Sequence, residues 1–400
     1  MEGNPEKKRL TPAEWVLLWG GRLIIHICYR IPYPFLPEIA RGLEVPLREA
    51  GFIVAVRSFM ALGAAGVGYW GQRAGYFRWM LGAILLMIAG CLVISGSSGL
   101  WLAALGFACT GLAQMAFSPA VQAYVSESVP YSQRGRAIGV AESTWAGSWF
   151  IGIPLAGILI ARLGWRSPFL IIAVLGVLLA ILAYKIRDRL DGRRTPPMAG
   201  DSPAGSTTGS YRQTLLKAAP VLAMSFFMVL GNETMMIVYG AWLEKSFHFK
   251  VESLGLFSAM FGFAELFGEL MVATIADRLG KRRCILVGLC ALAIAYPLLY
   301  RCGGSIPAAM AGLITVFFFF EFAIVSTFTF VSEFAPGERG QMLAANYSFA
   351  VGGRLVGALI GPWLWEMGGG LFYNGLSAGG CGLLAILLLF RAAGRGGWSD

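Results

Sequence analysis

Residues 276–283 read ADRLGKRR and form a short basic loop between two long apolar runs. A similar loop, GQRAG at residues 71–75, follows an apolar run in the first half of the chain. A second loop is also repeated, since SESVPYSQRG at residues 126–135 corresponds to SEFAPGERG at residues 332–340. Two separate loops that recur at an offset of roughly 205 residues indicate that the chain is an internal duplication.

The composition excludes a sizeable soluble domain. Only 14% of the 400 residues are charged and 57% are hydrophobic, whereas soluble proteins are about a quarter charged. The net charge of +10 does not indicate nucleic acid, because the Lys and Arg residues lie in short loops between apolar runs. The seven cysteines are scattered without a CxxC pair, and we find no Walker loop, HExxH motif or nucleophile elbow in a fitting context. We therefore expect no metal, no cofactor and no enzyme.

The apolar runs predict transmembrane helices, each of which needs about 20 apolar residues. The predicted fold class is an all-α membrane protein of about twelve such helices, arranged as two pseudo-symmetric six-helix bundles. The predicted spans are 15–36, 51–70, 79–94, 101–124, 138–161 and 169–184 in the first half, and 218–243, 254–276, 284–300, 306–331, 342–365 and 371–390 in the second.

A polar stretch rich in Pro, Gly, Ser and Thr separates the halves and predicts the domain limits. Residues 1–190 form the first bundle, 191–212 a cytoplasmic linker and 213–400 the second bundle. Basic residues are concentrated in alternate loops, in the linker and near both ends of the chain, so both termini are predicted to be cytoplasmic. We expect a multi-pass monomer in the lipid of a bacterial inner membrane.

The repeated loops resemble the major facilitator superfamily, in which a Gly, an Asp-Arg pair, another Gly and a basic cluster follow spans 2 and 8. The run GWRSPF at 164–169 is similar to one common in the same superfamily, and residues 147–157 are similar to the glycine-proline motif of its drug:proton antiporter and arabinose-efflux-permease branch. The resemblance covers nearly the whole chain and implies transport by alternating access. It assigns gating to the loop residues Gln72, Arg73, Arg134, Asp277, Arg278 and Arg339.

Three positions depart from the family pattern. Ile153 separates the glycine and proline of the span-5 motif. Gln72 stands where the family has its first Asp, so Asp277 is expected to matter more for gating than Gln72. Phe107 stands where antiporters carry an intramembrane Arg that is implicated in proton coupling.

Ionisable side chains within the spans predict a central aqueous cavity, because each costs about 2.5 to 3.5 kcal/mol at the centre of a bilayer. Spans 3, 6, 9 and 12 contain none in their apolar cores, which fits a lipid-facing position. The other spans carry the residues that we assign to the substrate and proton pathway: Arg22, His26, Arg30, Arg57, Gln114, Asn232, Glu233, Glu265, Glu269, Glu321 and Arg354.

Several readings of these residues stay open. Individual charges can be structural ion pairs, and His26 can be a hydrogen-bonded packing residue. Glu265 and Glu269 lie one helical turn apart and can share a proton, or each can meet a separate Arg. The aromatic run 317–320 before Glu321 fits either a pocket for a lipophilic cation or ordinary packing.

The predicted function is secondary active transport of a small organic molecule, with protons as the coupling ion and efflux as the direction. The alternatives are a proton-coupled importer of an organic anion, a lipid or lysolipid flippase, and a receptor built on the same fold. For the proton carrier, the sequence places Glu233 first, Glu321 second and the Glu265/Glu269 pair third, because Glu233 lies deep in a span next to the cavity.

The topology can be tested with single cysteines at Ser206 and Ser399 in a background without the native cysteines. Because the linker and the C-terminus are predicted to be cytoplasmic, a membrane-impermeant maleimide should label neither position in intact cells and both after permeabilisation. Labelling of either position in intact cells would contradict the predicted orientation.

Overall fold

The computed structural model describes residues 10–63, 75–192, 208–334 and 339–394. Every regular element in these ranges is a helix. Residues 193–207 of the predicted linker lie outside them, as do Gln72 and Arg73 of the first gating loop. The side chains of Asp277 and Arg339 are also outside the described part.

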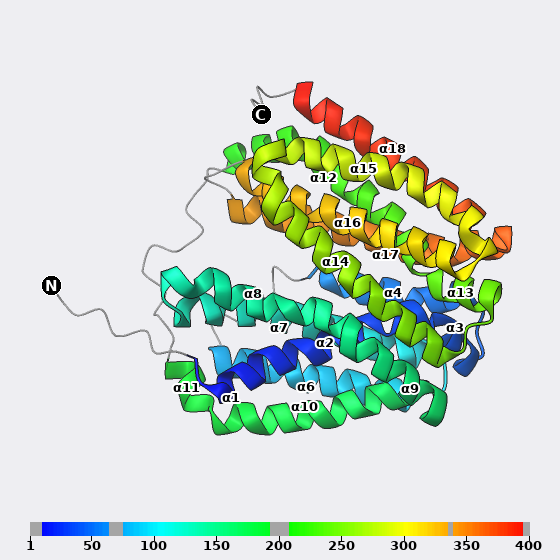
Figure 1. The fold of residues 1–400 in the computed structure, drawn as a ribbon. Coiled ribbons are helices and arrows are strands. Elements are labelled where there is room, and N and C mark those ends of the chain that lie inside the picture. The colour runs from blue at the N-terminus through cyan, green and yellow to red at the C-terminus, as the bar shows by residue number, and fades with distance from the viewer. Residues whose placement is uncertain (1–9, 64–74, 193–207, 335–338, 395–400) are drawn as a thin grey trace.

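The first half of the chain forms one group of helices, drawn from blue to green in Figure 1. Two of its elements are single π-helical turns, which interrupt the first and fifth predicted spans. The elements are α1 (Pro12–Trp15), η1 (Val16–Gly20), α2 (Gly21–Arg30), α3 (Pro32–Gly42), α4 (Leu47–Ala61), α6 (Tyr76–Ser95), α7 (Leu100–Ser128), α8 (Tyr131–Gly147), η2 (Ser148–Gly152), α9 (Ile153–Leu163), α10 (Ser167–Lys185) and α11 (Arg187–Gly192).

The second half forms a second group, drawn from green to red in Figure 1. Its elements are α12 (Thr208–Met236), α13 (Tyr239–Phe247), α14 (Val251–Leu279), α15 (Lys281–Leu299), the 3-10 turn η3 (Tyr300–Gly304), α16 (Ile306–Phe334), α17 (Arg339–Gly368) and α18 (Phe372–Gly394).

Ten helices of the described chain are long and apolar enough to cross a membrane, and they coincide with predicted spans 3 to 12. The first predicted span is divided into α1, η1, α2 and α3, and its polar face includes Arg22 and Arg30. The second predicted span corresponds to α4, which ends at Ala61. Residues 64–70 of that span lie outside the described residues. The fold is the all-α membrane architecture that the sequence predicts.

Spans 1 and 7 are each broken near the same end of the molecule. In span 1, Pro32 starts α3 and Phe35 leaves helical geometry at φ −109° and ψ 15°. In span 7, α12 ends at Met236 and α13 begins at Tyr239, so two residues separate the helices. Both short helices end close to a residue in the left-handed region, Glu44 at φ 57° and His248 at φ 53°. These residues are 204 positions apart, close to the offset of the repeat, so the break belongs to the duplicated unit.

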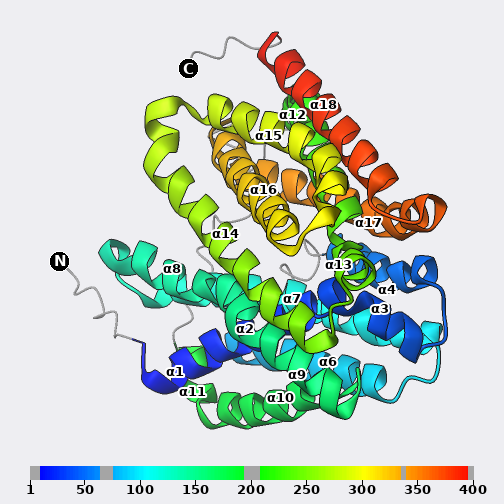
Figure 2. The ribbon, with the colours of Figure 1, turned by 45° about the vertical axis from the view of Figure 1, so that its right-hand side comes forward.

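The two bundles meet through close backbone contacts at this end. A Cβ on Gly240 of α13 would lie 2.3 Å from the carbonyl oxygen of Pro34 on α3. A Cβ on Gly157 of α9 would lie 3.3 Å from Cα of Gly255 on α14, and Figure 2 shows α14 reaching down to α9. Arg41 and Glu244 add an ion pair of 2.6 Å between α3 and α13. The end formed by α3, α13 and the start of α14 is therefore closed.

The helices without charged residues in their apolar cores lie at the periphery. These are α6, α10, α15 and α18, and each presents large exposed apolar side chains, such as Leu178 on α10 and Leu383 on α18. Exposure of so much apolar surface suits contact with lipid. None of these four helices lines the cavity described below.

Glycines on α17 seat this helix against α12 and provide a test of the packing. A Cβ at Gly353 would lie 2.3 Å from the carbonyl oxygen of Phe226, whereas a Cβ at the neighbouring Gly352 would lie an ordinary 3.5 Å from the Phe226 ring. We expect Gly353→Ala to lower stability by about 1–3 kcal/mol through overpacking. Gly352→Ala, the matched control, should leave the thermal unfolding midpoint of the purified protein nearly unchanged. Equal midpoints for the two variants would contradict the helix contact.

Candidate functional site

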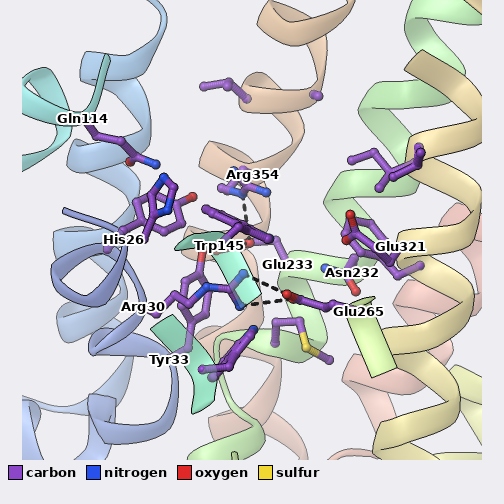
Figure 3. Close-up of a pocket in the computed structure, with 18 of the residues that line it drawn as sticks. His26, Arg30, Tyr33, Gln114, Trp145, Asn232, Glu233, Glu265, Glu321 and Arg354 are labelled. Carbon is purple, nitrogen blue, oxygen red and sulfur yellow. Dashed lines mark hydrogen bonds and ion pairs between the residues drawn. The ribbon is translucent and has the colours of Figure 1, made fainter. Parts of the chain in front are cut away.

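A cavity of about 600 Å³ lies between the two bundles. Its walls come from α2, α3, α7, α8 and η2 of the first half and from α12, α13, α14, α16 and α17 of the second. Ten of the eleven residues predicted for the pathway line it, and Figure 3 shows several of them converging from both sides. The exception is Arg57, which is buried behind the wall.

An ion pair between Arg30 and Glu265 crosses the cavity from α2 to α14 (Figure 3). Two hydrogen bonds, of 3.1 and 2.8 Å, join the guanidinium group to the carboxylate in bidentate geometry. The guanidinium carbon also lies 4.0 Å from the ring centroid of Trp145 and 4.3 Å from that of Trp149. The two tryptophan rings therefore cover the guanidinium group of Arg30. Arg30 thus binds the acid of the other bundle and the aromatic wall of its own bundle at the same time.

Glu233 of α12 is held from both bundles. Arg354 of α17 lies 3.4 Å from its carboxylate, and the Tyr33 hydroxyl of α3 donates a hydrogen bond of 3.1 Å across the interface. Arg57 supports this arrangement from behind, because it donates to Tyr33 at 3.3 Å and lies 3.8 Å from the ring centroid of Tyr29. Arg57 thus acts on the cavity through the two tyrosines instead of facing a ligand.

A third ion pair lies within the first bundle. Arg22 binds Glu142 of α8 with two hydrogen bonds of 2.7 and 2.8 Å, and Gln122 donates to the same carboxylate at 2.9 Å. His26 lies nearby, with Nδ1 3.2 Å from the Thr144 hydroxyl. The buried histidine is thus a hydrogen-bonded member of the wall, one of the two readings that the sequence left open.

Glu269 and Glu321 form a different kind of pair. Both line the cavity, and their carboxyl groups interact closely with each other. Two neighbouring carboxyl groups repel each other when both are ionised, so such a pair can hold one proton between them. Among the described residues, neither has a cationic side chain within 4 Å. Gly268 allows this contact, because its Cα faces α16 so closely that a Cβ would lie 3.1 Å from Cβ of Glu321. Glu269 therefore pairs with Glu321, while Glu265 meets Arg30.

Two neutral amides also face the cavity. Gln114 on α7 is 9% exposed, and within the described chain its side chain has no hydrogen-bond partner. Asn232 on α12 is 7% exposed and accepts a hydrogen bond of 3.0 Å from Tyr296, which leaves its amide nitrogen free among the described groups. Both side chains therefore present polar atoms on the cavity wall.

Aromatic residues that sequence reasoning missed form much of the wall. Trp149 and Tyr239 line the cavity and were not expected there. Phe317, from the aromatic run 317–320 that the sequence offered as a pocket or as packing, also lines it and stacks on Phe261 with ring centroids 4.3 Å apart and planes 7° apart. Trp149 belongs to the π-helical turn η2, where Gly152 packs so closely on Ile27 that a Cβ would lie 2.1 Å from it. The spacing of four residues between Trp145 and Trp149 could have indicated from the sequence that both face the cavity. Ordinary helix packing predicts the same spacing, so the sequence did not distinguish the two roles.

Two predicted gating residues have described side chains, Arg134 and Arg278, and neither lines the cavity. Arg134 donates from Nε to the carbonyl of Val129 at 3.4 Å, and Arg278 at the end of α14 is exposed. Lys281 and Glu333 of the second repeat form an ion pair between α15 and α16. The predicted difference between Asp277 and Gln72 stays a prediction, because these side chains lie outside the described residues.

A multi-span helical protein with a charged cavity between two repeated bundles belongs to the class of membrane transporters. The chain is a member of the Major Facilitator Superfamily, whose family model matches residues 18–223 and 221–399. It is 26% identical over 337 residues to YwfA of Bacillus subtilis, an uncharacterized MFS-type transporter, with 81% of this chain and 80% of the relative covered.

One further relative is similar in sequence, and one solved structure is similar in fold. The purine ribonucleoside efflux pump NepI of Escherichia coli K12 is 26% identical over 253 residues, with 62% of this chain and 61% of the relative covered. A crystal structure of a peptide transporter, POT, superposes with a TM-score of 0.78 over 96% of this chain and 94% of that chain, at 13% identity. The structural likeness confirms the fold, and the family match confirms a transporter.

Charge burial at the interface can be tested with two ion pairs that both join the bundles. We expect Glu265→Gln to destabilise the protein by about 3–5 kcal/mol, because it leaves the buried Arg30 without its acid. Glu366→Gln removes the exposed partner of Arg48, 3.8 Å away, and should cost about 0–1 kcal/mol. Thermal unfolding of both purified variants gives the comparison. If the two variants unfold alike, Arg30 does not depend on Glu265.

Proposed function

We propose that this transporter exports a small organic molecule across the bacterial inner membrane in exchange for protons, with both termini in the cytoplasm. The observation that carries the proposal is the Glu269–Glu321 pair, two neighbouring acids of the cavity wall that meet each other and not an arginine. Proton coupling needs a site of this kind, which can take up and release a proton beside the substrate space.

The charges of the cavity explain why this pair is the proton carrier. Three carboxylates are matched by arginines, since Glu142 meets Arg22, Glu265 meets Arg30 and Glu233 meets Arg354. Removing a proton from such an ion pair, or adding one, leaves its partner charge buried without compensation. The pair of Glu269 and Glu321 can change its proton content without breaking an ion pair.

This arrangement changes the order of the candidates. The sequence places Glu233 first, but Glu233 receives Arg354 and a hydrogen bond from Tyr33, so its negative charge is stabilised. Glu321 comes first in the proposed mechanism and Glu269 second, because each faces another acid instead of an arginine.

The alternating-access cycle would require the bundles to separate at the closed end. In the proposed orientation, α3 and α13 lie on the outer side, where Arg41 and Glu244 join the bundles. Deeper in the interface, the contacts of Arg30 with Glu265 and of Tyr33 with Glu233 must also open. Changes in protonation and substrate charge next to these contacts would shift the balance between the two states.

The efflux direction has two supports. NepI, whose sequence is similar over 62% of this chain, is described as a purine ribonucleoside efflux pump. An importer of organic anions is less well supported, because the arginines of the cavity are occupied by carboxylates of the protein.

A lipid flippase would need a lateral opening between the bundles, for which the described cavity gives no observation.

Proteoliposomes that contain the pH dye pyranine can test the coupling. With an acidic lumen, external addition of a transported compound from a panel of purine ribonucleosides, organic amines and organic acids should raise the lumenal pH. Glu321→Gln mimics the protonated acid, so it should abolish this pH change and leave exchange of labelled against unlabelled compound intact. Glu252→Gln, an exposed acid at the start of the same helix α14 as Glu269, serves as the control.

Two results would contradict the proposal. If Glu321→Gln and Glu269→Gln both move protons as the parent does, these acids are not the carriers. If all transported compounds move without any change in lumenal pH, the protein is a uniporter or uses another ion.

A further inference from the structure

Two cysteine side chains meet in the apolar core of the first bundle. Cys28 of α2 and Cys91 of α6 lie 63 positions apart in the chain, and their Sγ atoms are 3.9 Å apart. Cys28 is 2% exposed and Cys91 is fully buried. Neither thiol belongs to the described wall of the substrate cavity, so this pair is separate from the transport site.

The spacing of the two sulfur atoms suits a bridging ion better than a direct bond. Both thiols are free, and a disulfide would need an oxidant and would bring the sulfurs to about 2 Å. With metal–sulfur bonds as long as those of zinc, about 2.3 Å, a linear bridge would span roughly 4.6 Å between the sulfurs. The observed 3.9 Å is closer to the bridge than to the bond.

The surroundings limit an ion at this position to two protein ligands. Throughout the described ranges, no group of three or more His, Cys, Asp or Glu side chains is placed to hold a metal ion. Structural zinc takes four such ligands, and calcium and magnesium take oxygen ligands, so none of these ions suits two thiols. Soft ions that prefer thiolates fit the pair.

Charge selects among the soft ions. Two thiolates carry two negative charges, and both cysteines belong to the hydrophobic core, where an unpaired charge is costly. Arg22 and Arg30 of α2 already bind carboxylates, so they supply no counter-charge. A monovalent ion would leave the complex negative. A divalent species that forms two bonds to sulfur gives a neutral complex.

We propose that Cys28 and Cys91 form a buried dithiol site for a divalent thiophilic species that makes two bonds to sulfur, the class of the mercuric ion and of monosubstituted trivalent arsenicals. On binding, each thiol loses its proton and the incoming species loses two chloride or hydroxide ligands. Two bonds to sulfur form, and no oxidation state changes. The site goes beyond the proposed transport function and does not depend on it.

Retention of mercury by the purified full chain tests the inference. The reduced protein is incubated with mercuric chloride in the presence of excess glutathione and is then desalted, and elemental analysis gives the mercury bound per chain. We expect about one ion per chain, because two thiols fixed beside each other act as a chelate, whereas a single cysteine loses the ion to glutathione.

Serine variants identify the ligands. Cys28→Ser and Cys91→Ser should each lower the retained mercury by roughly tenfold or more, because either change leaves one thiol. Cys290→Ser removes an exposed thiol of α15 and is the matched control, which should retain mercury as the parent does. The thermal unfolding midpoint of each variant shows whether it is folded.

Two organic probes test the same point on the parent protein without any substitution. Phenylarsine oxide forms two bonds to sulfur and should be retained at about one molecule per chain in excess glutathione. Phenylmercuric acetate forms only one bond to sulfur, so glutathione should remove it.

Three outcomes would overturn the inference: the parent retains no mercury, either serine variant retains as much as the parent, or phenylarsine oxide is retained no better than phenylmercury. None of these results bears on proton-coupled export, which the pyranine assay tests separately.

Discussion

The contact between Arg30 and Glu265 is the interaction on which the arrangement of the cavity depends. A guanidinium group buried between two helical bundles is stable only with a carboxylate in bidentate contact and with its remaining surface covered. Trp145 and Trp149 provide that cover, and the π-helical turn η2 contains Trp149. The requirement to pair one buried charge therefore fixes the position of α14 relative to α2 and α8.

The same interface is built so that it can separate. Away from the charged contacts, the bundles meet through glycines, such as Gly157 with Gly255 and Gly240 with Pro34. Close backbone contacts of this kind need no interlocking side chains, whereas Trp149 and Phe261 meet across the interface as packed rings. The broken helices α3 and α13 concentrate these contacts at one end, where Arg41 and Glu244 add an exposed ion pair of small energetic weight.

The glutamates of the cavity differ in their partners. Glu233 and Glu265 are held by arginines, whereas Glu269 and Glu321 are held by each other. In a medium of low dielectric constant the nearest charge decides whether a carboxyl group keeps a proton. The proposed division between structural ion pairs and a proton site follows from that difference.

The sequence by itself determined the class of fold, because twelve apolar runs, two repeated loops and a low content of charge allow only a duplicated helical membrane protein. It also identified the residues of the cavity wall, since an ionisable side chain in a span must face protein or water. The pairing of those residues was decided by tertiary structure alone. Glu265 and Glu269 share one helix face, yet they meet Arg30 from α2 and Glu321 from α16, which lie 235 and 52 positions away in the chain. Helical periodicity specifies which side chains share a face, whereas the contact between faces depends on how helices cross, and close approach at Gly268 and Gly152 sets those crossings.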